Sequence, residues 1–291
     1  RWSGLCDFTI LDGIILRDVT ANDDLRGIWM RGDHNIIRNC ELYRIKRTGI
    51  VVQGGYNMIE HNVVDGIIGG SNHKYRGNSI SVESYYKAPD IRINCEYNVI
   101  QYNHFINNLT HAGINIFPAT DDPRQPLMKG NKIYYNYVAN IGAAVYVRYQ
   151  VNLEIIGNIF VHSVQDTSYG SPGGAITFDQ NRKMNPYPVP YDGGIIKIYK
   201  NTIANNTDYG IKNYNVNTLD LKNNVFIDSL SSNPKYLYLS FSYTAKDIKA
   251  EVDSNSYYGR GWWRWGVGTN QKNFEDWIKV SGQDKHGKYY P

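Results

Sequence analysis

The chain has 291 residues, a formal net charge of +4 and 42% hydrophobic residues, with a mean hydropathy of −0.49. It contains no run of about 18 apolar residues, the length that spans a bilayer as a helix, so we expect no membrane partner. Lys and Arg are scattered rather than clustered, which argues against a nucleic-acid partner. Three cysteines, an odd and sparse number, argue against a disulfide framework.

An aliphatic residue followed three positions later by Asn recurs along the chain, at Ile36/Asn39, Ile59/Asn62, Ile100/Asn103, Ile133/Asn136, Ile155/Asn158, Ile198/Asn201 and Leu221/Asn224. Ile10/Gly13 resembles an earlier copy without the Asn. From Ile10 on, the successive aliphatic residues are 26, 23, 41, 33, 22, 43 and 23 positions apart. The short spacings cluster near one value, and the long ones equal that value plus an inserted loop. A short fixed period indicates units that stack on their neighbours.

The second half of each unit is a small residue followed by alternating apolar residues: 27–31, 49–53, 79–83, 113–117, 144–148, 175–179 and 210–214. Alternation is the period of a strand. About 22 residues per unit fits three short strands joined by tight turns. We therefore expect an all-β parallel β-helix of about eight or nine coils. A stacked Asn would pass amide hydrogen bonds from coil to coil and tolerate left-handed backbone angles at a corner.

We expect residues 1–240 to form the coils and residues 241–291 to form a C-terminal aromatic cap. The cap contains a predicted short helix from Asn273 to Val280, with Asn273 as N-cap and Glu275 and Asp276 in its first turn. Because the chain starts at Arg1 inside a coil, we expect a truncated N-terminal end, covered by a missing segment or by another chain. Long insertions, at about 65–95, 118–130, 162–173 and 180–194, are expected to carry function.

The Asn-bearing coils from Phe8 to Leu230 resemble the right-handed parallel β-helix superfamily typified by pectate lyases and polygalacturonases. The ending from Trp277 to His286 resembles the closing segment of secreted carbohydrate-active β-helix proteins. This resemblance implies secretion and a polysaccharide or oligosaccharide partner. It does not choose among lyases, hydrolases, epimerases and non-catalytic proteins. The sequence lacks the catalytic motifs of polygalacturonases, mannuronan epimerases, and alginate and chondroitin lyases of this fold, so no catalytic residues are transferred.

Alternation along the aligned strands defines two outward columns, which the insertions flank. The first ends each strand: Arg31, Gln53, Glu83, Phe117, Arg148, Asp179 and Tyr214. The second lies two residues earlier: Trp29, Val51, Ser81, Asn115, Tyr146, Thr177 and Lys212. From the third coil onward these columns carry charged and aromatic side chains. We predict that the functional site lies on this face.

Our leading hypothesis is a glycoside hydrolase, which needs two carboxyl groups ~5–9.5 Å apart. Glu83 and Asp179 are three coils apart, about 14 Å at ~4.8 Å per coil, which is too far for a pair. Asp121 and Asp122 follow the coil between them, so either can pair with Asp179 or with Glu83. We expect Arg148 to keep Asp179 negative. The predicted sugar-binding residues are Arg148, Tyr146, Lys212, Tyr214, Arg31 and Trp29.

Two alternatives stay open. A lyase or epimerase acting on uronic-acid glycans needs a base beside the uronic carboxylate, and Arg148, Lys212, Tyr146 or His111 could serve. The hydrolase needs no cofactor, but the Asp cluster could hold Ca²⁺ in a lyase. A non-catalytic protein would bind glycan through the aromatic and polar side chains alone.

Overall fold

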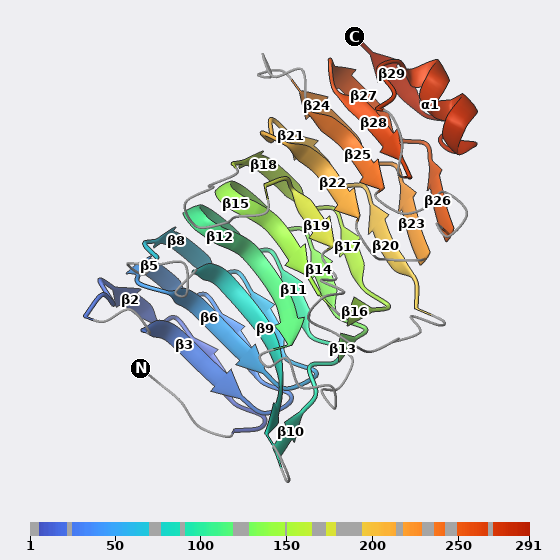
Figure 1. Cartoon of the computed structure of the whole chain (residues 1–291). Helices are drawn as coiled ribbons and strands as arrows, with labels where there is room; N and C mark the ends of the chain where they lie inside the picture. The colour runs from blue at the N-terminus through green and yellow to red at the C-terminus, as the bar shows by residue number, and fades with distance from the viewer. Residues whose placement is uncertain are drawn as a thin grey trace.

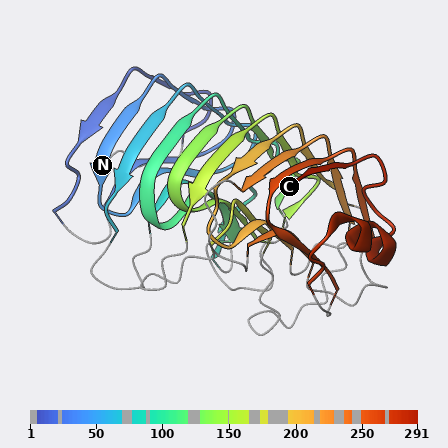
Figure 2. The same ribbon diagram turned by 90° about the horizontal axis from the view of Figure 1, so that it is seen from above.

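Successive coils of strands lie side by side from the N-terminal to the C-terminal end of the molecule (Figure 1). This computed structural model describes residues 6–21, 25–69, 77–87, 91–118, 128–148, 150–164, 173–178, 194–213, 218–228, 236–241, 249–266 and 270–291. Each coil contributes a strand to each of three faces, and equivalent strands of neighbouring coils pair in parallel. The expected parallel β-helix is confirmed, and Figure 2 shows its stacked coils from above.

The first face is a nine-stranded parallel sheet. Its strands are β1 (Ile10–Asp12), β4 (Ile36–Arg38), β7 (Met58–Glu60), β11 (Val99–Gln101), β14 (Lys132–Tyr134), β17 (Glu154–Ile156), β20 (Ile196–Tyr199), β23 (Thr218–Lys222) and β26 (Lys249–Asp253). The second face holds β2 (Ile15–Arg17), β5 (Glu41–Ile45), β8 (Val63–Ile67), β18 (Ile159–Ser163), β21 (Thr202–Ala204), β24 (Val225–Asp228), β27 (Ser256–Gly259) and β29 (Lys288–Tyr290).

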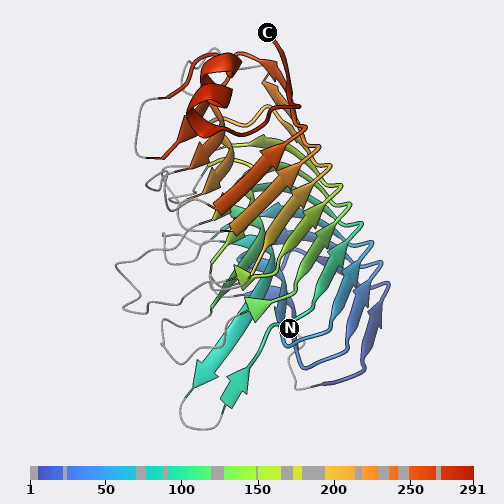
Figure 3. The same ribbon diagram turned by 90° about the vertical axis from the view of Figure 1, so that its right-hand side faces the viewer.

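The third face holds β3 (Arg26–Arg31), β6 (Thr48–Gln53), β9 (Asn78–Lys87), β19 (Ile176–Phe178), β22 (Tyr209–Asn213), β25 (Leu237–Phe241) and β28 (Trp262–Trp265). Two long strands, β12 (His104–Pro118) and β15 (Tyr137–Val147), run through both the second and the third face. Outside the coils, β10 (Ile91–Ile93) pairs antiparallel with β9. A short pair joins β13 (Met128–Lys129) to β16 (Gln150–Val151). Figure 3 shows β10 and the end of β9 projecting from the body.

Strand register confirms the inward column of the third face. Ile28, Ile50, Ile80, Ile114, Val145, Ile176 and Ile211 are paired one after another, and all lie in the core. The first face supplies a second buried column from Ile37 to Val252, with one aliphatic residue per coil. The core is therefore a continuous rod of stacked apolar side chains, as the repeat predicts.

The Asn repeat forms a hydrogen-bonded ladder. In each step the backbone N–H and the side-chain Nδ2 of one Asn donate to Oδ1 of the next; the members are Asn62, Asn103, Asn136, Asn158, Asn201, Asn224 and Asn255. Our two earliest copies were one residue out of register. The copy that aligns with Ile59/Asn62 is Ile37/Cys40 rather than Ile36/Asn39. The copy before it is Leu11/Ile14 rather than Ile10/Gly13. Cys40 takes the Asn position there, and its N–H donates to Asn62 Oδ1 at 3.0 Å.

The left-handed backbone angle belongs to the residue before each ladder Asn, not to the Asn itself. His61, Tyr102, Tyr135, Lys200 and Asn223 have φ between 53° and 58°. The ladder Asn is thus selected for its amide hydrogen bonds. A second ladder escaped the sequence analysis; it comprises Asn35, Asn57, Asn98, Asn131 and Gln150.

The predicted C-terminal helix is confirmed as α1 (Phe274–Ser281), with Asn273 as N-cap and Glu275 and Asp276 in its first turn. Parallel pairing continues past residue 240, because β26, β27 and β28 pair with β23, β24 and β25. The segment that we expect to form the cap therefore contributes a further coil before α1. Phe274 and Trp277 of α1 lie in the core cluster, so the helix covers this end of the rod.

Candidate functional site

A cavity of about 170 Å³ opens on the outer side of the third face, between the coils of β3 and β15. Its walls come from five successive coils and carry charged and polar side chains. They are Arg26, Arg47, Thr48, Asn78, Glu83, His111, Asn115, Phe117, Tyr146 and Arg148. Three guanidinium groups, one carboxyl, one imidazole and one phenol thus line one small space.

Strand register explains why these residues meet. Glu83 is paired with Phe117, and Asn115 is paired with Tyr146, so both predicted outward columns pass through the cavity. Arg148 follows β15, where its N–H donates to Ile116 O at 2.8 Å. In-register parallel strands repeat every ~4.8 Å, which brings residues 83, 117 and 148 of three successive coils together.

A small residue before each inward Ile shifts the alternation. A Cβ on Gly27 would lie 2.5 Å from Leu42 Cδ2, so this position faces the core as Ile28 does. A Cβ on Gly49 would likewise lie 2.7 Å from Val64 Cγ1. In each of these strands the glycine and the Ile after it both face the core, so the residue before the glycine faces outward. These residues are Arg26 and Thr48, and both line the cavity.

Glu83 is a partly buried carboxyl among positive charges. Burial raises the pKa of Glu83, and this effect outweighs Arg26, Arg47 and hydrogen bonds from Gln53 and Ser81, which all lower it. Gln53 Nε2 donates to Glu83 Oε2 at 3.2 Å. A carboxyl with a raised pKa can keep a proton at a pH where an exposed Glu has lost it, as a general acid requires.

His111 is buried at 6% exposure, and its ring nitrogen Nδ1 lies 2.9 Å from Asn78 Oδ1. The Asn78 amide nitrogen is committed to Ser81 Oγ at 2.9 Å, so the amide oxygen faces the ring. An oxygen only accepts, and we therefore assign the proton to Nδ1 in the neutral ring. That tautomer leaves Nε2 as an acceptor, which is the state of a general base.

Tyr146 and Arg148 form one unit. The Nε and Nη2 atoms of Arg148 lie 3.1 and 2.7 Å from Tyr146 Oη and donate to it. The Tyr146 ring meets the His111 ring edge-on, with centroids 5.0 Å apart. The phenol is therefore held between a guanidinium and an imidazole.

The structure brings together only part of the predicted site. Glu83, Tyr146 and Arg148 share the cavity. Arg31 lies outside it but is linked to Glu83 through Gln53. Trp29 is four coils from Tyr146 in register, and its ring is stacked by Arg26 and Arg31. Lys212 is two coils beyond Tyr146, with its Nζ 4.3 Å from the Tyr209 ring centroid. Trp29 and Lys212 are thus not wall residues of the cavity.

Four predicted site residues, Asp121, Asp122, Asp179 and Tyr214, lie outside the described residues, as do the centres of the insertions at 118–130, 162–173 and 180–194. The centre of the insertion at 65–95 is described and forms β9. Among the described positions, the sequence analysis missed Arg26, Arg47 and Asn78. Strict alternation backward from Ile28 would send Arg26 into the core. The signal that could have corrected this was the small residue at the start of every run.

A second cavity of about 330 Å³ is lined by Asp7, Asp33, Tyr56 and Glu96 among others. Its carboxylates already make hydrogen bonds or a salt bridge within the coils. Asp7 Oδ1 accepts from the Asp33 N–H at 2.7 Å, Asp33 Oδ1 accepts from the Gly55 N–H at 2.7 Å, and Glu96 pairs with Lys129 at 3.4 Å. This cavity lacks the guanidinium groups and the imidazole of the first.

Within the part of the chain that the structure describes, no group of three or more His, Cys, Asp or Glu side chains is placed to hold a metal ion. No helix there is long and apolar enough to cross a bilayer.

The family model described as right handed beta helix region matches residues 26–185, more than half of the chain. The chain belongs to the right-handed β-helix family. No curated protein matches this β-helix protein in sequence. Among solved structures, the pectate lyase Pel9A is similar at a TM-score of 0.58 and 12% identity, over 94% of this chain and 61% of the lyase. Our chain thus spans about three-fifths of that protein's length.

Two further solved structures are similar at lower TM-scores. PfbA, a surface adhesin of Streptococcus pneumoniae, is similar at a TM-score of 0.49 and 14% identity, over 96% of this chain and 72% of the adhesin. The Dettilon tailspike protein gives a TM-score of 0.42 at 14% identity, over 85% of this chain and 42% of the tailspike. At 12% identity the similarity to the pectate lyase bears on the fold alone, so the function must be argued from the cavity.

Proposed function

We propose that this protein is an enzyme that cleaves an acidic, uronate-containing polysaccharide by elimination at the Glu83–His111 cavity. The observation that carries the proposal is the set of side chains that line the cavity. Three guanidinium groups lie there together with one carboxyl whose pKa is raised and one buried imidazole. Guanidinium groups bind carboxylates in bidentate fashion, so Arg26, Arg47 and Arg148 suit a sugar acid. The cavity is smaller than the ~300–1,000 Å³ of drug-sized sites, so it suits one charged ring of a longer chain.

Each step has a group of the right kind. Arginines neutralise the uronate carboxylate, which makes the neighbouring C–H more acidic. His111 Nε2 takes that proton, and the C–H electron pair forms the new C=C bond. The glycosidic C–O bond breaks, and Glu83 in its neutral form protonates the departing oxygen. One proton leaves the sugar and one is delivered, so the products are an unsaturated sugar and a free hydroxyl.

An epimerase would use the same base and return the proton to the opposite face of the sugar carbon. The hydrolase that led our sequence analysis needs a second carboxyl beside Glu83. Among the described wall residues Glu83 is the single carboxyl. The hydrolase assignment to Asp179 with Asp121 or Asp122 stays a prediction. Secretion and Ca²⁺ binding also stay predictions.

The test is a panel of uronate polysaccharides and neutral glucans, assayed for both ultraviolet absorbance of a new C=C bond and new reducing ends. We expect both signals together, on uronate polymers alone. His111→Gln should lower kcat by about 10²-fold or more, the usual contribution of a general base. His104→Gln is the matched control, because His104 is an exposed residue of the same strand, outside the cavity. Reducing ends without absorbance would overturn elimination in favour of hydrolysis.

A further inference from the structure

Glu83 is the end of a hydrogen-bonded chain that runs across three coils. Arg31 Nε donates to Gln53 Oε1 at 2.6 Å, and Gln53 Nε2 donates to Glu83 Oε2 at 3.2 Å. Trp29 supports the start of this chain, because the Arg31 guanidinium lies 4.3 Å from its ring centroid. Gln53 itself is buried, at 2% exposure.

The direction of the Gln53 amide follows from chemistry. A guanidinium has only donors, so it must face the amide oxygen of Gln53. The amide nitrogen, which only donates, is then turned toward Glu83. Glu83 Oε2 must therefore accept in both protonation states. In the neutral acid the carbonyl oxygen is a better acceptor than the hydroxyl oxygen, so the Gln53 N–H favours a proton on the other oxygen, Oε1.

We infer that Arg31 and Gln53 are positioning residues that fix the rotamer of Glu83 and favour its exchangeable proton on Oε1. This inference extends the proposed function, in which Glu83 acts as the acid. It also gives Arg31 and Trp29, which we expected to touch sugar, a different task. They hold the far end of the chain that orients the carboxyl.

The test measures Glu83 directly and does not depend on substrate. Carbon-13 NMR of the Glu83 carboxyl, assigned with a Glu83→Gln variant, gives its titration midpoint. Gln53→Met removes the donor that favours the charged form, so the midpoint should move to higher pH. The pH profile of kcat should move the same way, with a loss of up to about 10²-fold from a misplaced acid and a smaller change in KM.

The matched control is Gln101→Met. Gln101 Nε2 donates to Glu60 Oε2 at 2.9 Å, the same Gln–Glu contact between neighbouring coils, but on the first face. This variant should leave the Glu83 midpoint and the pH profile unchanged. Should Gln53→Met not fold, Arg31→Met frees the Gln53 amide to turn and should raise the midpoint as well.

The outcomes separate the two proposals. A Glu83 midpoint that stays in place in Gln53→Met or Arg31→Met overturns the positioning role, whatever the enzyme does. A midpoint that rises in a protein without lyase activity supports the positioning role and overturns the proposed function. If the Glu83 midpoint rises equally in Gln101→Met, the change reflects a general loosening of the stack. That result would also overturn the positioning role of Gln53.

Discussion

Glu83 is subject to two opposing influences. Burial favours its neutral form, whereas Arg26, Arg47 and the donors Gln53 and Ser81 favour the charged form, and burial prevails. A carboxyl with a raised pKa in the folded protein lowers the free energy of unfolding at neutral pH, because its ionised form is less favourable in the folded protein than in the unfolded chain. Sites of this kind commonly exchange stability for activity.

The prediction for this residue is that Glu83→Gln is more stable and less active than wild type. The folded pKa of Glu83 lies above its ordinary value of 4.5, so wild type loses stability as the pH rises from 4.5 through the folded pKa. Gln does not titrate, and the variant should gain about 1 kcal/mol relative to wild type at neutral pH. The difference should vanish below pH 4.5.

Urea unfolding at several pH values measures this difference, and lyase assays measure the accompanying loss, expected at about 10²-fold or more. Glu60→Gln is the matched control, because Glu60 also accepts from a Gln of a neighbouring coil but lies on the first face, away from the cavity. A Glu83→Gln variant that is destabilised at neutral pH relative to acid would contradict the assignment.

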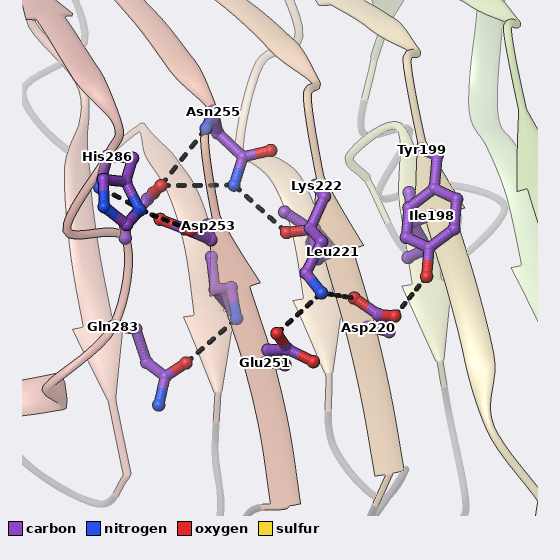
Figure 4. Close-up of polar contacts among 12 residues, drawn as sticks. Ile198, Tyr199, Asp220, Leu221, Lys222, Glu251, Asp253, Asn255, Gln283 and His286 are labelled. Carbon is purple, nitrogen blue, oxygen red and sulfur yellow. Dashed lines mark hydrogen bonds and ion pairs between the residues drawn. The ribbon is translucent and has the colours of Figure 1, made fainter.

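The Asn ladder ends in a residue of another type. Asn255 is the last Asn, and its N–H and Nδ2 point to Asp284 Oδ1 at 3.2 and 3.4 Å. Tyr257 Oη donates to the second oxygen of Asp284. Figure 4 shows Asn255 in this end region, with the Asp253–His286 and Asp220–Lys222–Glu251 contacts of the first face beside it. A carboxylate only accepts, so it can end a row of donors without passing them on.

For this element we expect Asp284→Ala to be far worse than Asp284→Asn. Alanine leaves the buried donors of Asn255 and Tyr257 without an acceptor, at about 1–3 kcal/mol each. Asparagine keeps the acceptor for Asn255, its amide nitrogen can donate to a Tyr257 hydroxyl that turns to accept, and it removes a carboxyl whose pKa burial raises, so we expect a change of about 1 kcal/mol or less. Thermal unfolding of both variants is the measurement. Equal losses would show that the ladder's hydrogen bonds do not hold this end.

Sequence reasoning reached the stack because its signals are local and repeated. The aliphatic–Asn spacing and the alternation after each small residue fix which side chains share a column, and register bore out the columns from Ile28 to Ile211 and from Trp29 to Lys212. The copy at Ile36 was set one residue off because Cys40 replaces Asn and Asn39 stands beside it, and the copy at Ile10 was aligned to it.

The candidate site was only half predictable. Glu83, Tyr146 and Arg148 follow from the outward columns, but Arg26 and Thr48 depend on a break in alternation that packing of Gly27 against Leu42 and of Gly49 against Val64 imposes. Such a break is set by packing between neighbouring coils, and in the sequence only the small residue repeated at the start of every run indicates it. The pairing of Asn78 with His111 is likewise a contact between residues 33 positions apart.

At the scale of the whole molecule, the two ends of the stack differ. The C-terminal end is covered by α1 and by β29, which pairs with β27. Within the described residues of the first coil, β1 and β2 pair on one side only, with β4 and β5. The inward-facing Leu11 and Leu16 are only partly buried there, whereas their partners Ile37 and Leu42 in the next coil are fully buried. In a stack where coils contact only their neighbours, such a coil has half of the usual support.

We therefore predict that this chain opens from its first coil. Burying Leu11 fully, as its equivalent Ile133 in β14 is buried, would contribute up to ~1.5–3 kcal/mol, so the opening free energy of β1 should be lower by a similar amount. Hydrogen exchange should be about tenfold to 100-fold faster in β1 than in β14, since each 1.4 kcal/mol is a factor of ten. β14 is the matched reference, because it is also a three-residue strand of the first face but pairs on both sides. Equal protection of β1 and β14 would mean that the stack opens as one cooperative unit.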